Sequence, residues 1–246
     1  MKRDQPDRVD GRRPKQARPL ARRIDDWFER RYLRKSKYMH VDGLWVGDWD
    51  AGHAPRTLPR VEEALRLIKE YDPLRYRYLL RDLDRVWVKL LTGAVGQFDY
   101  SLKACEIDER YVLATTTSSE MIASTIVHEA THARLIRCRI GYEEKIRARV
   151  ERICFRRQIS FCKKLPNGEP AREQVERKLA YYTAPRWTNA AMVAAYEKGT
   201  VEALRYLGCP EWVIRAIFRY RALIWSARRA ARRIRRLFGT TPPATS

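Results

Sequence analysis

The sequence predicts a mostly helical α+β protein in which a small antiparallel sheet packs on one central helix. Apolar residues recur at helical spacing over most of the chain, whereas residues 85–114 alternate in the manner of short strands. Hydrophobic residues make up 45% of the 246 residues and aromatic residues 11%, which is enough for a packed core. These three features exclude a disordered or an all-β chain.

The N-terminal part is basic and poor in regular patterns. Residues 1–22 are rich in Arg, Lys and Pro without an apolar period, so we expect a disordered basic tail. Residues 23–59 predict a basic helix over Ile24–Tyr38, followed by loops or short extended pieces, since five glycines and prolines fall between positions 41 and 59.

Residues 60–165 form the predicted central segment. Its apolar spacing predicts two helices and then a group of extended segments that form the antiparallel sheet: helices over 61–70 and 73–83, and extended segments over 85–90, 97–107 and 110–114. The stretch Thr117-Ser118-Ser119-Glu120 is a capping box, with Thr first and Glu three residues later, and predicts a helix that starts near Ser118. Gly141 should end that helix, and Tyr142–Lys164 should form the next one.

The C-terminal part, residues 166–238, reads as helical, and residues 239–246 as a flexible tail. The predicted helices cover 171–182, 188–197, 200–207 and an arginine-rich stretch from 211 to 238. No internal repeat is visible.

The net charge of +21 predicts attraction to polyanions such as nucleic acid or an anionic membrane surface. An arginine-rich surface without a specific partner explains the same charge. The five cysteines have no CxxC spacing and predict reduced thiols rather than a cysteine-built zinc site. No run of 18 apolar residues and no signal-peptide pattern is present, so we expect a cytoplasmic protein, with peripheral membrane binding as an option.

The motif His128-Glu129-Ala130-Thr131-His132 carries the clearest chemistry. Residues four apart share one face of a helix, so both imidazoles can hold one tetrahedral metal ion. Glu129 then stands beside the metal as a base for water. The alternative is an ordinary helix whose histidines hydrogen-bond to their neighbours.

The order of elements over about residues 60–165 resembles that of the zincin metallopeptidases. Helix comes first, then a small antiparallel sheet, then the HExxH helix, then a further helix that bears a glutamate. The metzincin pattern needs a glycine and a third histidine where this chain has Leu135 and Cys138. The gluzincin pattern takes a glutamate from the next helix, and Glu151 lies nineteen residues after His132. The resemblance therefore implies zinc bound by His128, His132 and Glu151, with Glu144 and Cys138 as alternative third ligands.

Under this resemblance the protein is a zinc-dependent hydrolase, a metallopeptidase acting on a peptide or protein substrate, with Glu129 as catalytic base. Tyr181, Tyr182 and Arg186 are oxyanion-stabilising candidates by residue type only. Two positions depart from the family pattern. Arg134 replaces an apolar residue, and Phe155 stands where an acid normally steadies a ligand histidine.

Two other functions fit the sequence. One is a basic binding protein on nucleic acid or an anionic membrane, acting through the arginines of the last predicted helix: Arg228, Arg229, Arg232, Arg233, Arg235 and Arg236. The other is a zincin fold that has lost activity and serves as a scaffold.

Overall fold

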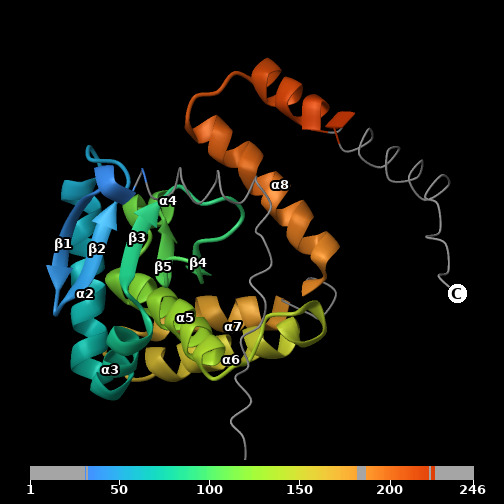
Figure 1. Ribbon diagram of the computed structural model, residues 1–246. Coiled ribbons are helices and arrows are strands. Elements are labelled where there is room, and N and C mark those ends of the chain that lie inside the picture. Colours follow the sequence, from blue (N-terminus) through green and yellow to red (C-terminus); the bar gives the residue numbers. More distant parts are fainter. Residues whose placement is uncertain (1–30, 32, 182–186, 222, 225–246) are drawn as a thin grey trace, which may run out of the picture. The chain divides into compact units, whose positions relative to one another are not determined.

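The computed structural model describes residue 31 and residues 33–181, 187–221 and 223–224. The chain separates into two units, Met1–Ser36 and Lys37–Ser246, and the account below concerns the second. The predicted basic tail, the arginine-rich stretch beyond residue 224 and the C-terminal tail lie outside the described residues, as does most of the helix predicted over Ile24–Tyr38. The mostly helical α+β fold is confirmed (Figure 1).

A five-stranded sheet lies at the centre, in the order β1-β2-β3-β5-β4. The two outer pairs, β1–β2 and β4–β5, are antiparallel, whereas β2–β3 and β3–β5 are parallel. The strands are β1 (Lys37–Val41), β2 (Leu44–Asp48), β3 (Arg85–Lys89), β4 (Gly96–Asp99) and β5 (Ala104–Asp108).

The sheet is thus mixed, and the prediction of antiparallel pairing is wrong for its two inner pairs. Helices α2 (Ala54–Tyr71) and α3 (Pro73–Asp82) connect β2 to β3, and a crossover of this kind leaves the two strands parallel. The extended segment expected over 110–114 is also wrong, since Glu109–Leu113 forms helix α4. The Asp108 side chain caps α4 by accepting a hydrogen bond from the Tyr111 amide at 3.2 Å.

The segment predicted as loops over 41–59 contains two structured elements. Asp42 and Gly43 both have positive φ, 49° and 84°, and form the two-residue turn of the β1–β2 hairpin. Helix α2 begins at Ala54, with Pro55 in its first turn where a missing amide proton costs nothing. Both elements belong to the same unit as the central segment, from which the predicted boundary at residue 60 separated them.

Helix α5 (Ser119–Arg137) contains the HExxH motif and packs against α2, α3, β4 and β5. Its cap is Ser118, whose hydroxyl accepts from the Met121 amide at 3.3 Å, so the capping box predicted at Thr117 is one residue out of register. The helix ends at Arg137 rather than at Gly141, since Arg139 adopts a left-handed φ of 62° and the Ile140 amide bonds back to the Leu135 carbonyl at 2.9 Å.

The remaining helices are α6 (Glu144–Cys162), α7 (Glu169–Tyr181) and α8 (Asn189–Tyr206), and residues 211–221 are also helical. The break predicted between residues 197 and 200 does not occur. Gly199 lies inside α8, and a Cβ there would stand 2.0 Å from the Gly93 amide nitrogen, so the glycine serves close packing. Within the described part of the chain, no helix is long and apolar enough to span a membrane.

The apolar core lies between the sheet, α2 and α5. It gives α5 a buried apolar stripe of Ile122, Ile126 and Val127, each without solvent exposure. This stripe fixes the rotation of α5, so His128 and His132 face α6 instead of solvent.

Candidate metal centre

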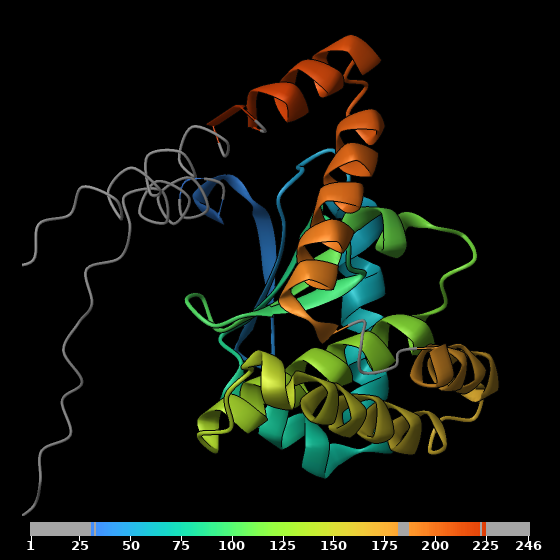
Figure 2. The same ribbon diagram turned by 90° about the vertical axis from the view of Figure 1, so that its right-hand side faces the viewer.

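Helices α5 and α6 lie side by side (Figure 2). Three side chains from these two helices meet between them. The His128 and His132 Nε2 atoms are 3.3 Å apart. The Glu151 carboxylate approaches both, with Oε2 at 3.3 Å from His128 Nε2 and Oε1 at 3.3 Å from His132 Nε2. The three residues predicted as metal ligands are therefore brought together.

These spacings suit a tetrahedral zinc ion. Ligand bonds of about 2.0–2.2 Å at tetrahedral angles place neighbouring donor atoms about 3.3–3.6 Å apart. Two unprotonated imidazole nitrogens and a carboxylate repel one another at such distances unless a cation lies between them. The donor set and its spacing thus fit the metal that the sequence predicts.

The charges around Glu151 show that this position attracts positive charge. Burial alone would raise the pKa of the Glu151 carboxyl, but hydrogen bonds from His128 and His132 outweigh it and hold the pKa well below its usual range. Burial opposes charging of His132, yet hydrogen bonds with Cys154 and Glu151 raise its pKa well above the usual value. The shifts of His132 and Glu151 both favour a positive charge beside the Glu151 carboxylate.

A hydrogen-bond chain fixes the orientation of His128. The Ser124 hydroxyl donates to the Met121 carbonyl at 3.0 Å, so its oxygen accepts from Gln158 Nε2 at 3.1 Å. Gln158 Oε1 then faces His128 Nδ1 at 3.0 Å and requires the proton on that nitrogen. With a metal ion present, this tautomer would turn the His128 Nε2 lone pair toward the ion, so Gln158 would support His128 in the way that an acid usually does.

Gln158 was not assigned this role from the sequence. The sequence signal for Gln158 is that it shares one face of the helix with Glu151 and Phe155. Phe155 lies four residues after Glu151, and Gln158 lies seven residues after it. Phe155 itself packs edge-on against His128, with ring centroids 4.8 Å apart.

Tyr142 is a second missed residue. Its hydroxyl donates to Glu151 Oε1, and its ring packs edge-on against His132 at 5.4 Å between centroids. Burial, followed by the charge of Glu151, raises the pKa of Tyr142, so the phenol keeps its proton and remains a donor. Tyr142 therefore holds the Glu151 carboxylate in place.

Cys154 is a third missed residue. Its sulfur lies within 4.8 Å of nitrogen atoms of His128 and His132, whereas the cysteine considered from the sequence as a possible ligand is Cys138. Burial raises the pKa of the Cys154 thiol, which favours the protonated form in the metal-free protein.

The alternative third ligands lie elsewhere. Cys138 is exposed, and Glu144 Oε1 accepts from the Asn189 amide at 3.1 Å, at the start of α8. Glu151 is thus the predicted third ligand that the structure places beside both histidines.

Glu129 is buried beside strand β4. A Cβ on Gly96 would lie 3.1 Å from Glu129 Oε1 and 2.7 Å from Thr125 Cγ2, so only glycine lets β4 approach α5 this closely. Burial raises the pKa of the Glu129 carboxyl despite the opposing effect of the two histidines. A carboxylate with a raised pKa is suited to accept and return a proton.

The charge of Lys178 on α7 also acts on Glu129. The lysine is half-buried, its charge interacts with the Glu129 carboxylate, and burial lowers its pKa.

The structure does not bring the predicted oxyanion-stabilising residues to the site among the described residues. Tyr181 is 61% exposed, and Tyr182 and Arg186 lie outside the described residues.

Arg134, one of the two departures from the family pattern, packs against Tyr78 of α3. Its guanidinium carbon lies 3.8 Å from the ring centroid of Tyr78, a cation–π contact that anchors α5 to α3. The charged side chain therefore does not disturb the metal centre.

Comparison of the chain with family models, with curated proteins and with solved structures finds no match. The resemblance to zincins therefore depends on the motif and on the geometry described above.

Proposed function

We propose that this protein is a zinc-dependent hydrolase of the gluzincin type that cleaves peptide bonds. The observation that carries the proposal is the meeting of His128, His132 and Glu151, with donor atoms 3.3 Å apart, beside the buried Glu129. A zinc ion held there would polarise water and a substrate carbonyl as a Lewis acid.

The protein's own side chains supply the proton transfers. Glu129 accepts a proton from the attacking water and donates it to the leaving amine, for which its raised pKa is suited. Lys178 brings positive charge toward the same carboxylate and favours its ionised form, which accepts the proton. Gln158 and Tyr142 position His128 and Glu151 respectively.

The sheet supports a peptide as substrate. Strand β4 is the last strand in the sheet order, and Gly96 places it against Glu129. A terminal strand can pair with an extended peptide through main-chain hydrogen bonds. Such a peptide would lie along β4 with a carbonyl near Glu129.

The experiment compares three variants in a peptidase assay with a quenched-fluorescent peptide library, together with zinc analysis. Glu129→Gln should keep zinc and lose at least about a hundredfold in hydrolysis, since general base catalysis contributes about 10²–10⁴-fold. His132→Ala should lose the zinc ion of this centre and, with it, the activity. Glu120→Gln, an acid in the first turn of the same helix, is the matched control and should retain both.

A wild-type protein that holds zinc but cleaves no peptide, ester or amide would refute the hydrolase and leave a scaffold. Hydrolysis by Glu129→Gln at the wild-type rate would refute the role of Glu129.

A further inference from the structure

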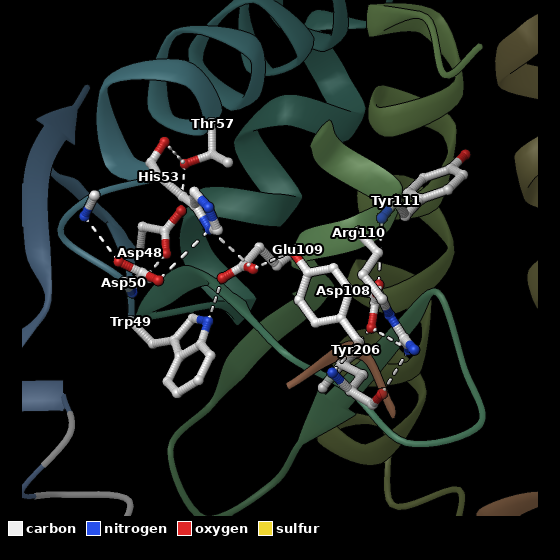
Figure 3. Close-up of polar contacts among 12 residues, drawn as sticks. Asp48, Trp49, Asp50, His53, Thr57, Asp108, Glu109, Arg110, Tyr111 and Tyr206 are labelled. Atoms are coloured by element: carbon white, nitrogen blue, oxygen red, sulfur yellow. Dashed lines mark hydrogen bonds and ion pairs between the residues drawn. The ribbon is translucent and has the colours of Figure 1, made fainter. Parts of the chain in front are cut away.

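A second group of histidine and carboxylate side chains lies at the carboxyl ends of the parallel strands β2 and β5 (Figure 3). Asp50 follows β2, His53 immediately precedes α2, and Glu109 follows β5. Because β2, β3 and β5 run parallel, their carboxyl ends meet at one edge of the sheet, where ligands commonly bind. The term second cluster refers below to Asp50, His53 and Glu109.

The donor atoms of the second cluster are close enough to share one ion. Glu109 Oε1 lies 3.0 Å from His53 Nδ1, and Asp50 Oδ2 lies 3.6 Å from the same nitrogen. One donor atom from each residue lies within 4.8 Å of the other two. These separations bracket those expected around a divalent transition metal with bonds of about 2.0–2.2 Å.

Glu109 of the second cluster makes no ion pair with arginine or lysine among the described residues, in contrast to four other buried acids. Four buried carboxylates pair with arginine or lysine: Asp72 with Arg75 and Lys164, Asp82 with Arg81 and Arg137, Glu106 with Lys89, and Asp108 with Arg110. Among the described residues, the buried acids without such an ion pair are Glu129 and Glu151 at the metal centre, and Asp48 and Glu109 here.

This contrast matters because the chain is rich in cations, with 51 Lys and Arg against 30 Asp and Glu. Burying a carboxylate is costly unless it is paired or coordinates a metal. Both places where buried acids gather without an ion pair to arginine or lysine also contain histidine, which is the composition of a metal site.

The imidazole of His53 supplies an independent observation. Its Nδ1 atom is buried and makes no hydrogen bond with the described residues, although Glu109 Oε1 is only 3.0 Å away. The nitrogen thus lies beside the carboxylate without directing an N–H toward it. A cation shared by the nitrogen and the carboxylate would satisfy both.

The surrounding contacts hold Glu109 rigidly. The Trp49 indole donates to Glu109 Oε2, and the Tyr206 hydroxyl donates to Oε1 at 3.0 Å. The Asp48 carboxylate accepts from the Asp50 amide at 2.8 Å and fixes the loop after β2. Side-chain exposures of 43% for Asp50 and 33% for His53, against 1% for Glu109, leave a side open to solvent.

We propose that Asp50, His53 and Glu109 form a second metal site that takes a borderline divalent cation of the Zn²⁺ or Mn²⁺ class. One imidazole nitrogen excludes a pure calcium or magnesium site, which is built from oxygen ligands. Two carboxylates and the lack of a thiolate disfavour soft ions such as Cu⁺. The inference does not depend on the proposed hydrolase activity.

The test counts metal ions in the purified full-length chain after dialysis against Zn²⁺, and in parallel against Mn²⁺, followed by elemental analysis. The wild-type protein should hold two equivalents of zinc. His53→Ala and Glu109→Gln should each hold one, His132→Ala should hold one, and the double variant His53→Ala with His132→Ala should hold none.

Asp42→Asn is the matched control, since Asp42 is a similarly exposed loop acid, 39% exposed, that pairs with Lys69. It should keep two equivalents. Circular dichroism and thermal unfolding of each variant show whether it is folded, and Zn²⁺ should raise the melting temperature of His132→Ala but not of the double variant.

The results separate the two sites. One equivalent in the wild type that is unchanged by His53→Ala and lost by His132→Ala would overturn the second site and leave the HExxH centre intact. One equivalent lost by His53→Ala but kept by His132→Ala would support the second site and overturn the HExxH centre.

Discussion

Replacement of Gln158 by leucine tests whether a neutral amide orients the first ligand histidine. Gln158→Leu keeps the buried volume but removes the acceptor that lies 3.0 Å from His128 Nδ1 and the donor that reaches Ser124. Loss of such a support typically costs about 10–100-fold in metal affinity. This corresponds to about 1.4–2.8 kcal/mol of binding free energy.

The metal-free protein should also lose stability in this variant. The substitution leaves His128 Nδ1 without its acceptor, and a buried donor without an acceptor costs about 1–3 kcal/mol. The site is buried, since Gln158 is only 5% exposed. Urea unfolding of the metal-free variant should therefore show a loss of this size, separate from the change in zinc affinity.

Competition with a chromogenic chelator measures the zinc affinity. Gln174→Leu on α7 is the control, because the same substitution is made on a neighbouring helix without a ligand histidine. Gln158→Glu restores an acceptor for His128 Nδ1 and should bind zinc at least as tightly as the wild type. Equal zinc affinity of Gln158→Leu and Gln174→Leu would refute the orienting role of Gln158.

Three further predictions concern other parts of the molecule. Cys154→Ser should retain zinc, and the cobalt-substituted protein should lack a sulfur-to-cobalt charge-transfer band; such a band would make Cys154 a ligand. Burial, with the charges of Glu109 and Asp50, raises the pKa of Asp48 from 3.8 to about 6. The folded, metal-free protein therefore binds this proton more tightly than the unfolded chain does. Its free energy of unfolding falls as the pH rises through that range. In urea titrations, the free energy of unfolding of Asp48→Asn should rise relative to that of the wild type by about 1–2 kcal/mol between about pH 4 and pH 7, after allowance for solvent screening. A difference between the two proteins that stays constant with pH would contradict this. Gly199→Ala should lower stability by about 1–3 kcal/mol in thermal unfolding, since its Cβ would meet the Gly93 backbone at 2.0 Å, and an unchanged melting temperature would contradict that packing.

The helices of the central segment were predictable because their apolar stripes face one core. The sheet was less predictable. Whether β2 and β3 run parallel depends on the crossover between them, and the pattern within each strand does not show it. Nothing in the local pattern of Arg85–Lys89 shows that its neighbours run parallel to it. The Asp42-Gly43 pair is a recognisable hairpin signal, and the prediction of loops over residues 41–59 does not use it.

At the metal centre, local spacing predicted the face shared by His128 and His132. Glu151 followed from family resemblance and from its position on the next helix. The roles of Gln158 and Tyr142 could not be predicted, because they depend on the crossing of α5 and α6 and on the turn before Glu144. The second cluster joins residues up to 59 positions apart, Asp50 and Glu109, which no local motif connects.

Zinc analysis of the wild type and of His132→Ala tests the central claim most directly. If His128, His132 and Glu151 form a metal site, His132→Ala should contain one equivalent of zinc less than the wild type, whereas Glu129→Gln should contain as much as the wild type. Equal zinc content in the wild type and in His132→Ala would contradict the account.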